Sequence, residues 1–191
     1  MASKNGPTVM GTDGRDFLHR QKVASQYQVS VQAKTRLKFC LFLHLLLFIV
    51  MLIKLSPDIL DKLNIFILEI EELEIPQPLK WEYVWSFCML YSLFAWSACK
   101  KNNTLLLQVY AGGIVALGLA PALFALCYYL PDVYRFASSG SAEGQLVWQG
   151  YPYSMINLAF LLAALQVHAF SLLFSSRLLA AWRVRGAGKA Q

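Results

Sequence analysis

Charged residues are scarce in this sequence: they make up 15% of its 191 residues, whereas hydrophobic residues make up 57%. A soluble domain of ordinary composition carries about 25% charged residues. The deficit is concentrated in four stretches without any Asp, Glu, Lys or Arg, which are residues 39–53, 83–99, 105–130 and 154–176. Each lies near or above the ~20 residues that a helix needs to cross a bilayer. The scarcity excludes a soluble domain and predicts an all-α polytopic membrane protein with four transmembrane helices.

Cations are almost missing from one side of the predicted bundle. Of the 17 Lys and Arg residues, 13 lie in the N-terminal segment up to Lys38, the second connection or the tail. The positive-inside rule therefore places both termini in the cytosol. The predicted division is residues 1–36 (cytosolic arm), 37–55 (first span), 56–82 (luminal connection), 83–99 (second span), 100–104 (cytosolic connection), 105–130 (third span), 131–153 (luminal connection), 154–176 (fourth span) and 177–191 (cytosolic tail).

The predicted cytosolic side has few acidic or histidine side chains that could act in catalysis. On the cytosolic side the only acids are Asp13 and Asp16, and the only histidine is His19. Metal-dependent or acyl-transfer chemistry needs several such groups at one interface. A pore needs polar residues along one helix face, and no predicted span supplies them. We therefore expect no enzyme activity, catalytic residue, cofactor, metal or nucleic-acid partner, with an integral-membrane lipid-modifying enzyme or a small channel as the alternatives.

Two histidines stand out inside the spans, His44 in the first and His168 in the fourth. Both lie on the order of 10 Å from the cytosolic end of their helix, so we expect them to share one level of the bundle. Ser92 of the second span is a further member of this predicted polar layer. The layer indicates hydrogen bonding between helices. A metal site or a pH sensor is the alternative, although two histidines without a carboxylate make a poor ligand set.

The first luminal connection carries a helix-start pattern at Ser56, Pro57 and Asp58, with a capping hydroxyl, a proline and an acid. Apolar residues follow at helical spacing, namely Ile59, Leu60, Leu63, Phe66, Ile67, Ile70 and Leu73. An acidic run then leads to Pro76 and Pro78, which should end the helix. We predict a luminal acidic helix that forms a docking face or lies on the leaflet, or else packs its apolar side on the bundle.

The third span has small residues at four-residue spacing, Gly112, Ala116 and Ala120, with Gly113 and Gly118 beside them. Small residues at this period let two helices approach closely. The pattern indicates tight packing and allows self-association through the third span. Pro121 predicts a kink.

The N-terminal arm reads as a basic, weakly amphipathic helix that starts near Asp16. Its cations are predicted to contact the anionic cytosolic leaflet. They are Arg15, Arg20, Lys22, Lys34, Arg36 and Lys38. The alternative is a disordered arm whose charge only sets the topology.

Several stretches taken together resemble one family. They are GTDGRDF at 11–17, VASQYQ at 23–28, LEIEELEIPQPLKWEYVW at 68–85, QGYPY at 149–153 and QVHAF at 166–170. In this order, over almost the whole chain, they resemble the Jagunal family, and the acidic luminal run is most similar to its insect members. The resemblance implies a four-span endoplasmic reticulum (ER) protein that supports ER organisation and vesicle-mediated transport and exocytosis in the early secretory pathway. It brings no catalytic residues.

The tail departs from the family pattern. Members can end in lysine-rich tails that look like dilysine retrieval signals, whereas this chain ends RVRGAGKAQ. Arg183, Arg185 and Lys189 remain candidates for a basic retrieval or lipid contact, with ordinary positive-inside charge as the alternative. The expected partners are ER membrane lipids and coat or tethering proteins of the early secretory pathway.

Overall fold

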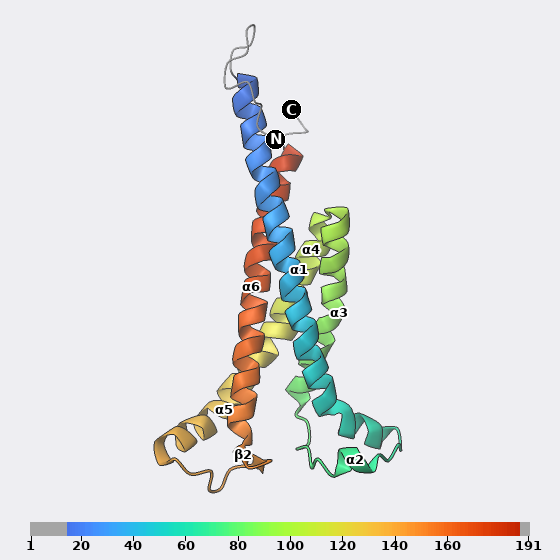
Figure 1. Ribbon diagram of the computed structural model, residues 1–191, viewed down its shortest axis with the longest axis vertical. Coiled ribbons are helices and arrows are strands. Elements are labelled where there is room, and N and C mark those ends of the chain that lie inside the picture. Colours follow the sequence, from blue (N-terminus) through green and yellow to red (C-terminus); the bar gives the residue numbers. More distant parts are fainter. Residues whose placement is uncertain (1–14, 188–191) are drawn as a thin grey trace.

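The computed structural model describes residues 15–187, with side chains except at 15–19, 22, 26 and 184–187, and it confirms the all-α prediction (Figure 1). The helices are α1 (Arg15–Lys62), α2 (Leu68–Glu71), α3 (Lys80–Lys101), α4 (Thr104–Gly113), the π-helical η1 (Ile114–Leu119), α5 (Ala120–Ser139) and α6 (Tyr153–Ala187). A two-stranded antiparallel hairpin, β1 (Val147–Trp148) and β2 (Tyr151–Pro152), precedes α6.

The long helices run along one axis, with α1 and α6 side by side (Figure 1). The start of α1 and the end of α6 lie at one end of the molecule, which we call the stalk end. The segment α2 and the β-hairpin lie at the other, which we call the loop end. At the stalk end α1 and α6 extend beyond the turn between α3 and α4 (Figure 1).

Within the described part of the chain, three segments are long and apolar enough to cross a membrane: Val23–Lys62, Thr104–Ser139 and Tyr153–Arg183. They expose large apolar side chains such as Phe39, Phe124 and Leu162, as lipid-facing helices do. The helix α3 is not among them, because Trp, Tyr and Ser lower its hydropathy. The four-span arrangement therefore stays a prediction.

Pro57 does not begin a helix, so the predicted start at Ser56–Asp58 is wrong: α1 continues through it to Lys62. A proline inside a helix leaves the carbonyl four residues earlier without its N–H partner. Here that carbonyl belongs to Ile53, and the Ser56 hydroxyl donates to it at 2.6 Å. The Ser56 hydroxyl, which was predicted to cap a new helix, instead gives the Ile53 carbonyl the hydrogen-bond donor that Pro57 lacks.

The predicted acidic helix from Ile59 to Leu73 is also wrong as one element. Asn64 adopts a left-handed conformation (φ 54°), and the amides of residues 64 and 65 bond the carbonyls of Asp61 and Leu60, both at 2.9 Å. This pattern is a Schellman motif, which ends α1. Between this motif and α3, only the four residues of α2 are helical. Phe66 and Leu68 are more than half exposed, so this segment does not pack its apolar side on the bundle.

The third predicted span lies in one continuous helical segment, in which α4, η1 and α5 follow one another without a gap. The π-helical turns lie directly before Pro121, at the predicted kink; π insertions are a recognised cause of helix bends. Gly113 and Gly118 face the bundle, whereas Gly112, Ala116 and Ala120 are exposed. The four-spaced stripe thus lies on the outside, and self-association through it stays a prediction.

The N-terminal arm is part of α1, which passes without a break into the first predicted span. Its Arg20 is exposed, while the side chains of Arg15 and Lys22 lie outside the described residues. The last three predicted lipid contacts each lie 5.5–5.8 Å from the centroid of an aromatic ring of the bundle: Lys34 over Trp182, Arg36 over Phe174 and Lys38 over Trp96. Lipid contact by the arm stays a prediction. In the tail, Arg183 is exposed, and the Arg185 side chain and Lys189 lie outside the described residues.

The buried side chains form two clusters along the bundle. The cluster toward the stalk end includes Leu37, Tyr110 and Leu178. The cluster toward the loop end includes Met51, Trp85, Tyr129 and Leu161. On both α1 and α6, a buried histidine lies in sequence between the residues of the two clusters.

Replacing Gly113 with alanine should destabilise the bundle, because the new Cβ would lie 2.1 Å from the Tyr91 ring. We expect a loss of about 1–3 kcal/mol, the usual cost of overpacking. Thermal unfolding of the purified protein in mild detergent measures it. Gly112→Ala is the matched control, since nothing lies within 4 Å of its Cβ. Equal midpoints for both variants would contradict the packing of α4 on α3.

Candidate functional site

Two buried histidines from different helices meet between the two clusters. The rings of His44 on α1 and His168 on α6 have centroids 4.8 Å apart and lie edge to face. The Ser92 hydroxyl on α3 lies 2.9 Å from Nδ1 of His44. All three side chains are at least 96% buried. The structure thus brings the three residues of the predicted polar layer together from three helices.

Trp85 belongs to the same layer, although the sequence reasoning missed it. Its indole N–H donates to Nε2 of His168 at 3.1 Å. That nitrogen must therefore be unprotonated, so a neutral His168 carries its proton on Nδ1. The missed signal is the spacing on α3, because Trp85 and Ser92 are seven residues, or two turns, apart and so share one face.

Cys88 adds a third side chain that can bind a metal. Ligand atoms of His44, Cys88 and His168 all lie within 4.8 Å of one another, and all three residues are buried. His44 suits a metal ligand, because Ser92 bonds Nδ1 and Nε2 has no partner in the part of the chain that the structure describes. At His168, however, a metal on Nε2 would have to displace the Trp85 N–H. The arrangement therefore fits hydrogen bonding between helices better than metal binding.

Gly118 on the π-helical segment closes this layer. A Cβ at this position would lie 3.0 Å from Sγ of Cys88 and 3.1 Å from Nε2 of His168. A side chain there would press on both groups, so the glycine lets η1 approach them closely.

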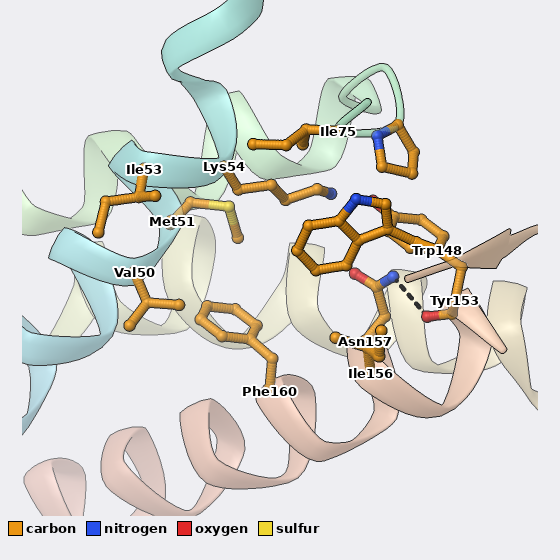
Figure 2. Close-up of a pocket in the computed structure, with 11 residues that line it drawn as sticks. Val50, Met51, Ile53, Lys54, Ile75, Trp148, Tyr153, Ile156, Asn157 and Phe160 are labelled. Carbon is orange, nitrogen blue, oxygen red and sulfur yellow. Dashed lines mark hydrogen bonds between the residues drawn. The ribbon is translucent and has the colours of Figure 1, made fainter. Parts of the chain in front are cut away.

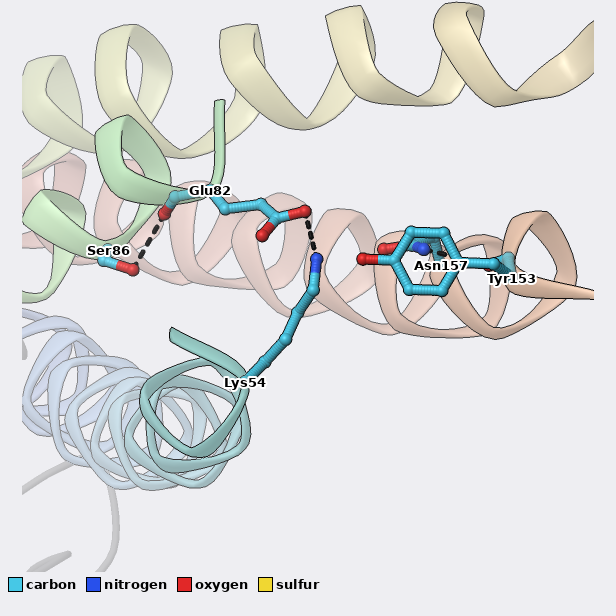
Figure 3. A network of polar contacts seen from close by, with 5 residues as sticks. All are labelled: Lys54, Glu82, Ser86, Tyr153 and Asn157. Carbon is cyan, nitrogen blue, oxygen red and sulfur yellow. Dashed lines mark hydrogen bonds and ion pairs between the residues drawn. The ribbon is translucent and has the colours of Figure 1, made fainter. Parts of the chain in front are cut away.

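A second polar centre lies at the loop end, where Lys54 of α1 pairs with Glu82 of α3 (Figure 3). Lys54 ends the first predicted span, as a snorkelling cation does. Glu82 is fully buried, and its second oxygen has no hydrogen-bond partner among the described residues. The Lys54 ammonium also lies 5.0 Å from the centroid of the Tyr153 ring. The sequence pattern places Glu82 at the end of the luminal connection and does not predict its ion pair with Lys54.

An apolar cavity of about 180 Å³ borders this ion pair (Figure 2). Residues of α1 and α6 form its walls, including Val50, Met51 and Phe160. Trp148 of β1 and the chain at Ile75 also line it, and the Lys54 and Asn157 side chains supply its polar groups. The cavity thus lies where the two longest helices, α1 and α6, meet both loop-end connections.

The comparisons with known proteins decide the family. The profile described as "Jagunal, ER re-organisation during oogenesis" matches residues 1–186. This chain belongs to the Jagunal family.

Curated members of the Jagunal family are similar over nearly their whole length. Protein jagunal of Drosophila melanogaster is 46% identical over 98% of each chain. The Caenorhabditis elegans homolog is 31% identical over 94% of this chain and 96% of its own. Protein jagunal homolog 1 of Homo sapiens is 31% identical over 95% of this chain and 94% of its own. The predicted family is therefore confirmed, and none of these names denotes an enzyme.

Removing the Ser92 hydroxyl should loosen the polar layer, because Nδ1 of His44 would lose its buried partner. We expect Ser92→Ala to lower stability in detergent by about 0.6–1.7 kcal/mol, the range for hydrogen bonds between membrane helices. Combined with His44→Ala, it should cost less than the sum of the two single changes. Ser97→Ala on the same helix is the control, and strict additivity would show that Ser92 and His44 do not interact.

Proposed function

We propose that this protein is a non-catalytic, four-span membrane protein of the ER that supports ER organisation, and through it vesicle-mediated transport and exocytosis in the early secretory pathway. The observation that carries the proposal is the Jagunal profile, which matches residues 1–186 and is described by ER re-organisation. A structural role also fits the polar layer, whose Trp85–His168 and His44–Ser92 bonds join helices within the bundle.

The stalk end is the part we propose to engage partners. It consists of residues 20–38 of α1 and 174–183 of α6. Trp182 donates its indole N–H to the Ser30 hydroxyl at 3.1 Å, and Lys34 donates to the side-chain oxygen of Asn102 in the α3–α4 turn. Ala33 and Leu178 are buried at this junction. These contacts make the stalk an ordered platform for coat or tethering proteins, with Arg183 on its surface.

The membrane arrangement is proposed from the direction of the helices. The start of α1 and the end of α6 lie at the same end (Figure 1), which agrees with an even number of crossings. The helix α3 has 22 residues, about 33 Å at 1.5 Å per residue, and exposes Phe87, Leu90 and Leu93. We propose α3 as the remaining span. With the positive-inside rule, the stalk end is then cytosolic and the loop end luminal.

A protease added to sealed microsomes should test this orientation. We expect epitopes at both termini to be cut and an epitope inserted after Glu71 to be protected, because the proposed topology places both termini in the cytosol and the loop end in the lumen. Permeabilised microsomes provide the control, since every epitope should then be cut. Protection of either terminus in sealed microsomes would contradict the proposed topology.

Charge reversal on the stalk should separate partner binding from folding. In cells that lack the native protein, we expect Arg36→Glu with Arg183→Glu to reach the ER at normal levels, yet to restore ER shape and cargo secretion at least several-fold less well than the unchanged chain. The reason is that both cations are exposed at the stalk end. Arg135→Glu, exposed on α5 away from it, is the matched control. Full rescue by the double variant would contradict recruitment through these cations.

A further inference from the structure

Two cavities of opposite character meet at Lys54. The apolar cavity described above lies on the bundle side, between α1 and α6. A second, polar cavity of about 330 Å³ lies beyond it and shares Lys54, Ile75 and Pro76 with the first. Its other walls include Asp58, Asp61 and Glu71.

The apolar cavity opens toward the outer surface of the bundle. Val50 and Ile53 line it, and both are more than half exposed on the side of α1 that faces outward. Pockets for whole drug-sized ligands measure about 300–1,000 Å³, so a cavity of about 180 Å³ suits a segment of one acyl chain. A lipid can enter it sideways from the bilayer.

Lys54 marks the level where the apolar region ends. It follows the apolar run of α1, and its ammonium has three N–H donors, of which Glu82 occupies one. The Tyr153 side chain is more than nine-tenths buried and lines the apolar cavity. Its hydroxyl has no hydrogen-bond partner among the described residues. Figure 3 shows that hydroxyl pointing toward the Lys54–Glu82 pair. Lys54 and Tyr153 together offer donors for a phosphate.

The polar cavity has an excess of negative charge. Lys54 is already neutralised by Glu82, and Asp58 by Lys62 at 2.6 Å. Asp61 and Glu71 have no ion-pair partner among the described residues. A head group that is itself anionic would meet these carboxylates, whereas a primary ammonium would be attracted and could donate hydrogen bonds to them.

We propose that this loop-end site binds one phosphatidylethanolamine molecule from the bilayer. One acyl chain occupies the apolar cavity, the phosphate accepts from Lys54 and Tyr153, and the ammonium lies against Asp61 and Glu71. The order of apolar wall, cation and carboxylates along the bundle matches the order of chain, phosphate and amine in this lipid. The proposal requires α1 and α6 to lie in the membrane, and it does not depend on a trafficking role.

Native mass spectrometry of the full chain in mild detergent tests the site. Phosphatidylethanolamine and phosphatidylglycerol with identical acyl chains are titrated separately. We expect one ethanolamine lipid to be retained at least ~5-fold more tightly than the glycerol lipid. Asp61→Asn with Glu71→Gln should abolish that preference. The matched control is Glu69→Gln with Glu72→Gln, which changes acids of the same connection that do not line the cavity.

A second pair of variants tests the acyl-chain cavity independently. Val50→Trp should fill the cavity from its exposed rim and weaken ethanolamine-lipid retention at least ~5-fold, while thermal unfolding without added lipid stays unchanged. Leu46→Trp, on the exposed surface of α1 but outside the cavity, is the control. Equal or tighter binding of phosphatidylglycerol would overturn the proposal. So would a preference that survives in Asp61→Asn with Glu71→Gln, or retention that Val50→Trp leaves unchanged.

Discussion

Polar groups buried in an apolar bundle need protein partners, and this constraint sets how the helices of this protein are aligned. Apolar packing between membrane helices is weakly directional, whereas an unpaired buried polar group is costly. The His44–Ser92 and Lys54–Glu82 contacts fix α1 along α3 at two levels, ten residues apart on each helix. The Trp85–His168 bond then fixes α6 to α3 between those levels. Sliding any of these helices by one turn would break at least one buried contact.

The sequence was sufficient for the broad fold because the charge-free stretches and the cation asymmetry are long-range signals. It also placed His44, Ser92 and His168 at one level, since depth in a membrane helix follows from counting residues from its end. Trp85 and Cys88 escaped because tryptophan and cysteine carry no charge and read as ordinary apolar residues. The sequence connects Trp85 to the polar layer only through its seven-residue spacing from Ser92. That spacing indicates a hydrogen bond only when His168 is known to lie opposite Trp85.

Two predictions at the loop end are wrong for the same physical reason. The helix start at Ser56 and the helix up to Leu73 were predicted from local sequence patterns, and these patterns do not show which hydrogen bonds the same residues form in the folded chain. Ser56 and Pro57 match a helix start, yet the same hydroxyl can bond the Ile53 carbonyl and let the helix pass. The actual end of α1 depends on Asn64, whose left-handed conformation is only moderately favoured for asparagine. The arm shows a different case: the sequence predicts a boundary between residues 36 and 37, but α1 continues through that point without a break.

The two ends of the bundle differ in how they hold charge, and this difference follows from the same constraint. At the stalk end, Lys34, Arg36 and Lys38 lie over aromatic rings, and Arg36 and Lys38 remain exposed. At the loop end, Lys54 is drawn inward by a fully buried glutamate, so its charge is cancelled and the acids beyond it dominate. In the proposed topology, a bilayer around this protein would meet cations on one leaflet and carboxylates on the other. Under the positive-inside rule this asymmetry would orient the chain through its basic end, and the proposed lipid site would make the acidic end selective for head groups that carry an amine.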